Sequence, residues 1–203
     1  MWTLLKSGGI LMLPLLCCGL AATFIIIERF LYFSAIKKSD EQLKKNLSDA
    51  LLSRDFSAAE AACVTAGTPF ARVIKKAVEF RKLSEKDLKE IVEAEIELAI
   101  PLYEHSLTLL ATIASVSTLL GLLGTVTGNI KAFGVLGAGG SVGNPAVLAN
   151  AIAEALVTTA TGLFVAIPAT IFNNFFTRKV NKEIILLESS VTEIVLKITG
   201  RIY

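Results

Sequence analysis

Residues 155–177 read ALVTTATGLFVAIPATIFNNFFT, a run of 23 uncharged residues that lies between Glu154 and Arg178. Two similar runs come earlier in the chain, 21 residues at 7–27 and 25 residues at 106–130. An α-helix needs about 20 residues to cross the ~30 Å hydrocarbon core of a bilayer. Each run is long enough, so the sequence predicts three transmembrane helices.

The overall composition agrees with a membrane protein. Of the 203 residues, 53% are hydrophobic and 19% are charged, whereas a soluble domain carries roughly 25% charged residues. This composition excludes an ordinary soluble enzyme and a disordered chain. The apolar residues recur at helical spacing and no strand pattern competes, so we expect an all-α, polytopic membrane protein. Its second and third helices should be long and extend into the cytoplasm.

Few residues suggest a catalytic or metal site. The chain has three cysteines, Cys17, Cys18 and Cys63, and one histidine, His105. This set lacks the spacing of a zinc site or a disulfide framework. A net charge of +2 without a basic stripe gives no reason to expect nucleic-acid binding. We therefore expect no enzyme, no cofactor and no metal.

The basic residues predict the orientation, because Lys and Arg concentrate on the cytoplasmic side of a membrane. They flank the spans at 36–108 and after residue 177, while 134–147 carries no charge. The first run is longer than the roughly 7–15-residue apolar core of a secretion signal, so we expect a retained membrane helix. The predicted segments are transmembrane helix 1 at 1–35, a cytoplasmic helical domain at 36–108, transmembrane helix 2 at 109–133, an external loop at 134–147, transmembrane helix 3 at 148–175 and a C-terminal cytoplasmic helix at 176–203.

The charged segment carries helix start and stop signals. Capping residues, a proline suited to the first helical turn and a glycine stop occur at Ser39, Ser57, Thr68-Pro69, Ser84 and Gly67. From Ser84 to Gly121 no glycine intervenes. We therefore expect one long helix that enters the membrane, kinked or divided at Pro101.

The second and third spans each have a polar and a small-residue stripe. The polar stripes are Ser115, Thr118, Leu122, Thr125 and Asn129, and then Glu154, Thr158, Thr161 and Val165. The small-residue stripes are Ala114, Ser117, Gly121, Gly124 and Gly128, and then Ala155, Thr159, Gly162 and Ala166. Small residues let helix backbones approach closely. Each threonine either bonds back to a carbonyl one turn earlier or lines a polar path.

Glu154 stands apart, because a carboxylate inside a span is costly, by about 2.5–3.5 kcal/mol at the membrane centre. Two environments are possible for this carboxylate. It either faces the interior of a helix bundle or a water-filled cavity, or it extends to the lipid headgroups on the external side. We expect no basic residue in either neighbouring span to offer a buried partner. If Glu154 is buried, we expect its partner to be water, a threonine hydroxyl or another subunit.

Two motifs resemble the signatures of the MotA/TolQ/ExbB proton-channel family. They are LGLLGTV at 120–126 with Gly128 and Phe133, and AEAL at 153–156 with Thr159-Ala160, Gly162-Leu163, AIPA at 166–169 and Asn173. The Ile27-Glu28-Arg29 end of the first span and the Phe56, Ala59, Cys63, Pro69 spacing also match. Three spans and the Glu-bearing third motif place the resemblance with the ExbB and TolQ branch. One departure is Ser117-Thr118, where the family often has Ala-Pro.

The resemblance implies a bacterial inner-membrane motor subunit with a periplasmic N-terminus and a cytoplasmic C-terminus. Such a subunit forms a homopentamer around a dimer of an ExbD- or TolR-like partner with one span, which supplies an aspartate. Proton motive force then energises an outer-membrane or envelope process through a TonB- or TolA-like protein. A non-conducting structural collar for a membrane complex is the alternative.

The resemblance also assigns roles to residues. Thr125 and Thr159 match ion-path positions, with Glu154 near the external mouth. The polar stripes add secondary pore-facing candidates, Thr118, Asn129, Thr158 and Thr161. Hydroxyls both donate and accept hydrogen bonds, so they can carry a water chain without holding charge. This chain has no acid at mid-membrane, and the acid must therefore come from the partner.

Overall fold

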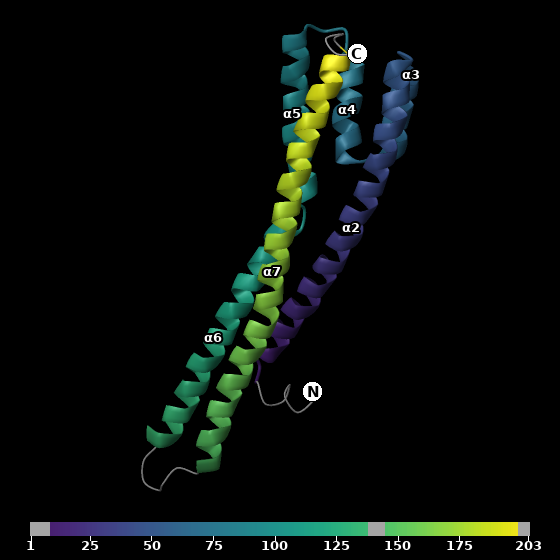
Figure 1. Ribbon diagram of the computed structural model, residues 1–203. Helices are drawn as coiled ribbons and strands as arrows, with labels where there is room; N and C mark the ends of the chain where they lie inside the picture. The colour runs from purple at the N-terminus through teal and green to yellow at the C-terminus, as the bar shows by residue number, and fades with distance from the viewer. Residues whose placement is uncertain (1–8, 138–144, 199–203) are drawn as a thin grey trace. The chain divides into compact units, whose positions relative to one another are not determined.

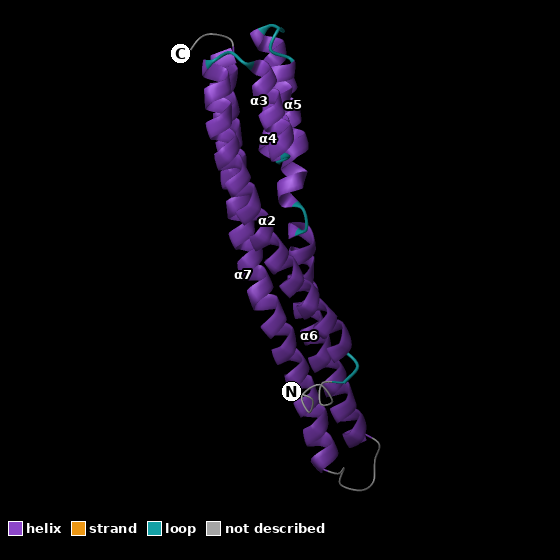
Figure 2. Cartoon of the chain, turned by 90° about the vertical axis from the view of Figure 1, so that its right-hand side faces the viewer, coloured by secondary structure: helices purple, strands orange, loops and turns teal. Residues whose placement is uncertain are grey.

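The structure, a computed structural model, describes residues 9–137 and 145–198. All regular elements in these two ranges are helices, as Figures 1 and 2 show. In chain order they are α2 (Met12–Leu52), α3 (Phe56–Ala66), α4 (Pro69–Glu79), α5 (Glu85–Glu104), α6 (Leu107–Gly137) and α7 (Pro145–Ile198). Three of them, α2, α6 and α7, are long and apolar enough to cross a membrane. The predicted all-α class with three candidate spans is confirmed.

The chain divides into two compact units. The span unit contains the described residues up to Glu28 and those from Ser106 to Phe175. The charged unit contains residues 29–105 and the described residues from Phe176 onward. Helices α2 and α7 contribute to both units, because each continues well past its apolar run.

In the span unit, α6 and α7 pack through small residues. The closest facing pairs are Gly121 with Gly162, Gly124 with Thr158 and Gly128 with Ala155. A Cβ atom added at Gly162 would lie only 2.6 Å from the carbonyl oxygen of Ser117. The helix backbones thus approach so closely that only glycine fits there. The predicted packing role of the small-residue stripes is confirmed.

The charged unit has helix ends fixed by side chains. Thr68 caps α4, Ser84 caps α5, and Gly67 ends α3 with a left-handed backbone at φ 61°. These three signals are as predicted. The predicted starts at Ser39 and Ser57 are wrong: Ser39 lies inside α2, and Asp55 caps α3 by accepting from the Ala58 N–H.

The predicted single long helix, kinked or divided at Pro101, is wrong as well, because the break falls at residues 105–106, after Pro101. Helix α5 passes through Pro101 and ends at Glu104, and α6 begins at Leu107 after Ser106 with φ 65°. Side chains of α2 donate hydrogen bonds to backbone carbonyls at the C-terminal end of α5. The Arg29 guanidinium donates to the Tyr103 carbonyl at 3.4 Å, and the Tyr32 hydroxyl donates to the Leu102 carbonyl at 3.1 Å. These bonds satisfy carbonyls that the end of a helix otherwise leaves without partners.

Asp40 connects α2 to the start of α4. The Thr68 hydroxyl donates to Asp40 Oδ1 at 2.5 Å and accepts from the Ala71 N–H at 3.1 Å. Burial raises the pKa of Asp40, and the nearby Glu183 adds to this, while the bond from Thr68 and the charge of Lys44 oppose it. The carboxyl therefore ionises less readily in the folded protein than in the unfolded chain.

We expect Asp40→Asn to stabilise the protein at neutral pH relative to the wild type. As pH rises from the unfolded-chain value of 3.8 through the raised folded pKa, the unfolded state releases its proton first and wild-type stability falls. Asparagine avoids this loss and still accepts from Thr68. Denaturant unfolding in detergent from about pH 4 to about pH 8 measures the difference, which should grow with pH. Asp49→Asn, at an exposed site on the same helix, is the control; an equal effect there would refute the burial argument.

Candidate functional site

Glu154 forms an ion pair across the span unit. Its Oε1 atom lies 2.7 Å from Lys131 Nζ, and the two side chains are 27% and 57% exposed. The expectation that no basic residue of a neighbouring span would pair with Glu154 is wrong. Lys131 lies just past the uncharged run, but α6 continues to Gly137, so the lysine remains on the helix and reaches α7.

The segment that leads into α2 also approaches Glu154. Gly9 has a left-handed backbone at φ 66°, and a Cβ atom there would collide with Glu154 Oε1. Both the backbone angle and the lack of space require glycine. Glu154 therefore contacts residues that adjoin or belong to all three spans, an arrangement the sequence reading missed. The nearest sequence signal is the glycine itself, five residues before the first proline.

Thr159 makes a hydrogen bond between helices. Its hydroxyl donates to the Gly121 carbonyl of α6 at 2.8 Å, and its side chain is half-buried. Thr125 lies one turn farther along α6 and donates to the Leu122 carbonyl at 2.7 Å. In both residues the hydroxyl hydrogen is engaged, while the oxygen keeps lone pairs that can accept from water.

The secondary candidates occupy different environments. Thr118, Thr158 and Thr161 donate back to carbonyls one turn earlier, those of Ala114, Glu154 and Val157 respectively. Thr158 is buried against α6, while Thr118 and Asn129 are exposed on α6. The structure thus brings Thr158 and Thr159 to the α6–α7 contact and leaves Thr118 and Asn129 on the outer surface of this single chain.

Ser117 belongs to the same contact. Its side chain is fully buried, and its hydroxyl finds no hydrogen-bond partner within the described ranges. A closely packed helix interface therefore contains a buried hydroxyl at this position. The resemblance described above had singled out Ser117, whereas its burial is known only from the fold.

The remaining reactive groups have structural surroundings. Burial raises the pKa of the Cys63 thiol to about 11, with a further contribution from Glu60, so the thiol stays protonated at neutral pH. Burial also raises the pKa of the Tyr103 hydroxyl. Across residues 9–137 and 145–198, His, Cys, Asp and Glu side chains form no group of three or more that could hold a metal ion.

Comparisons with known proteins bear on this site. Residues 65–189 match the MotA/TolQ/ExbB proton channel family. The chain is 31% identical over 191 residues to an ExbB-like biopolymer transport protein of Synechocystis sp., covering 94% of this chain and 91% of the relative. It is 49% identical over 82 residues to the biopolymer transport protein ExbB of Xanthomonas campestris, covering 40% and 32%. It is 46% identical over 78 residues to the Tol-Pal system protein TolQ of Haemophilus influenzae, covering 38% and 34%.

Proposed function

The chain belongs to the MotA/TolQ/ExbB proton channel family, in its ExbB/TolQ branch, and from this premise we propose that it is the channel subunit of an inner-membrane motor. The motor uses proton motive force to energise a process at the outer membrane or envelope, of the TonB or Tol-Pal type. Moving one charge across 100 mV releases roughly 2.3 kcal/mol, which is enough to bias a conformational step.

The observation that carries the proposal is the Thr159 hydrogen bond between α6 and α7. Together with Thr125 it places two hydroxyl oxygens on a closely packed helix pair, where each can accept from a water molecule. Lys131 of α6 and Glu154 of α7 supply charges closer to the loop that connects these two helices. Thr118, Asn129, Thr158 and Thr161 are proposed as secondary polar positions, reached by water or by neighbouring subunits in the assembly.

The proposed assembly supplies what this chain lacks. Between Glu154 and Arg178 the chain has no acidic residue, so a proton crossing here needs a carboxylate from elsewhere. We assign it to an ExbD- or TolR-like partner with one span bearing an aspartate. A pentameric collar of this chain would surround a dimer of that partner and act on a TonB- or TolA-like protein.

The proposed topology follows the charges. The N-terminus and the loop at 134–147 face the periplasm, and the charged segment 36–108 and the tail 176–203 lie in the cytoplasm. Segments 1–35, 109–133 and 148–175 contain the spans. The support is the concentration of Lys and Arg on one side of these segments.

A non-conducting collar is the competing function. The glycine contacts and the back-bonded threonines also suit a helix pair whose only task is packing. Co-reconstitution with the partner in vesicles containing a pH-sensitive dye distinguishes the two. The channel proposal expects proton uptake when a potential is imposed, whereas no flux at any voltage would establish the collar.

The ion pair offers a separate test of the proposed outer mouth. Lys131→Glu places two carboxylates side by side, and we expect it to reduce proton flux by up to about fivefold, since a partly exposed pair contributes about 0.2–1 kcal/mol. The exchanged double variant Lys131→Glu/Glu154→Lys should recover part of that loss, because the attraction is restored. Lys131→Arg is the charge-preserving control. Wild-type flux in Lys131→Glu would remove the pair from the path.

A further inference from the structure

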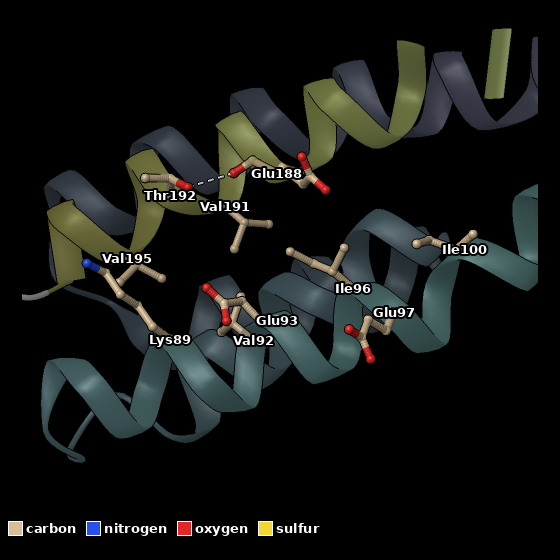
Figure 3. A pocket seen from close by; sticks show the side chains of 10 residues that line it. All are labelled: Lys89, Val92, Glu93, Ile96, Glu97, Ile100, Glu188, Val191, Thr192 and Val195. Atoms are coloured by element: carbon tan, nitrogen blue, oxygen red, sulfur yellow. Dashed lines mark hydrogen bonds between the residues drawn. The ribbon is translucent and has the colours of Figure 1, made fainter. Parts of the chain in front are cut away.

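A groove of about 660 Å³ lies in the charged unit, between α5 and α7. Figure 3 shows Ile96 of α5 and Val191 of α7 projecting into the space between the two helices. The floor is apolar, and the rim carries charged or polar side chains. Floor residues are Val92, Ile96, Val191 and Val195, with Ile100 at one end, and rim residues are Lys89, Glu93, Glu97, Glu188 and Thr192.

The rim has a negative charge that the chain does not neutralise. Glu93, Glu97 and Glu188 are exposed, and none of them has a basic partner within ion-pair distance in the described ranges. Lys89 is already paired with Glu85 of its own helix at 3.0 Å. Three carboxylates therefore surround an apolar floor without compensating cations.

We propose that this groove binds a basic amphipathic helical segment of a partner protein. From Lys89 to Ile100 the groove follows α5 for about three turns, or roughly 16 Å, which suits a short helix laid between two others. The apolar face of the segment covers Ile96 and Val191, and its Lys or Arg residues pair with the three glutamates.

This chain does not itself offer such a segment. Its most basic amphipathic stretch is α4 with the residues that follow it. The apolar face of α4 is already buried inside the charged unit and consists of Phe70, Val73, Ile74, Ala77 and Val78. The stretch 37–45 of α2 mixes its lysines with Asp40 and Glu41. Charge complementarity therefore favours a partner protein over a second copy of this chain.

The proposed function indicates which protein provides the basic segment. Only this identification of the partner rests on the proposed function. A single-span partner carries Lys and Arg where its chain leaves the membrane on the cytoplasmic side. The charged unit is proposed to lie on that side. The cytoplasmic flank of the partner is thus the segment we assign to this groove.

Peptide binding to the full-length chain tests the charge argument. The chain is placed in nanodiscs of zwitterionic lipid, and the probe is a fluorescein-labelled peptide of about 14 residues with leucines at helical spacing and lysines elsewhere. We expect Glu93→Gln/Glu97→Gln/Glu188→Gln to weaken binding about tenfold or more, because three ion pairs are lost. The control Glu60→Gln/Glu90→Gln/Glu104→Gln makes the same change in net charge at exposed sites outside the groove and should stay within about twofold. Unchanged binding in the groove variant, or equal weakening in the control, overturns the proposal.

Disulfide trapping tests the position. In a background without the three native cysteines, Thr192→Cys should form a disulfide with the same peptide carrying one cysteine, and Ser189→Cys on an exposed neighbouring face of α7 should not. A disulfide that joins two copies of this chain at Thr192→Cys instead assigns the groove to a second copy and overturns the proposal. Neither readout involves proton flux: flux without peptide binding refutes the groove alone, and peptide binding without flux refutes the channel alone.

Discussion

Thr159→Val is expected to reduce proton flux in the reconstituted complex about ten- to a hundredfold while the complex still assembles. Valine matches threonine in size, so the contact with the Gly121 backbone is kept, but the hydroxyl that donates to the Gly121 carbonyl is lost. With it goes a site that accepts from water in the proposed chain. Hydrogen bonds to charged groups contribute about 1.5–3 kcal/mol, which corresponds to a reduction of about ten- to a hundredfold.

Matched variants separate the hydroxyl from the helix. Thr159→Ser retains the hydroxyl and should retain most of the flux. Thr170→Val removes a hydroxyl from the same span, one that bonds back to the Ala166 carbonyl at 2.8 Å, and should leave flux near the wild-type level. Size-exclusion chromatography with the partner reports assembly. Full flux in Thr159→Val would remove this residue from the ion path.

Gly162→Val is expected to separate α6 from α7 and to prevent assembly. A side chain at this position meets backbone atoms, with its Cβ 2.6 Å from the Ser117 carbonyl oxygen and 2.9 Å from Gly121 Cα. Backbone atoms of two helices cannot move aside as a flexible side chain can. Overpacking of this kind costs about 1–3 kcal/mol and sometimes more, and the Thr159–Gly121 hydrogen bond would be lost as well.

The control for this variant is Gly134→Ala, because a Cβ atom at Gly134 meets nothing within 4 Å. It should leave the melting temperature unchanged or slightly raised, since alanine favours the helix more than glycine does. Thermal unfolding in detergent, followed by the helical circular dichroism signal, measures both variants. An undiminished melting temperature in Gly162→Val would show that the backbones of α6 and α7 do not approach each other as closely as these distances require.

Sequence signals predicted those parts of the fold that depend on residues close together in the chain. The charge-free runs gave the three candidate spans, and Thr68, Ser84 and Gly67 marked helix ends correctly because each acts within one turn. The end of α5 was not predictable in this way. It is held by Arg29, 74 residues before Tyr103, and by Tyr32, 70 residues before Leu102.

The same distinction applies to the candidate site, of which some parts were predictable from the sequence and others were not. The small-residue stripes predicted which faces of α6 and α7 meet, because periodicity alone assigns a helix face. The partner of Thr159 is a backbone carbonyl, which every residue has, so no residue type signals it. The pairing of Lys131 with Glu154 was not predicted, because a charged residue at the end of an apolar run is ordinarily taken as the border of the span. Here the lysine pairs with a carboxylate 23 positions away.

The burial of Arg29 has a consequence for the order of events during synthesis. Arg29 leaves the ribosome long before Tyr103, whose carbonyl it contacts in the finished protein. At about 5–20 residues per second, roughly 4–15 s pass before that partner exists. The Tyr32 ring, whose centroid lies 4.4 Å from the guanidinium carbon, is by contrast made only three residues after Arg29. The contact that joins α2 to the end of α5 can therefore form only after residue 103 has been made, whereas the contact between Arg29 and Tyr32 is available from the start.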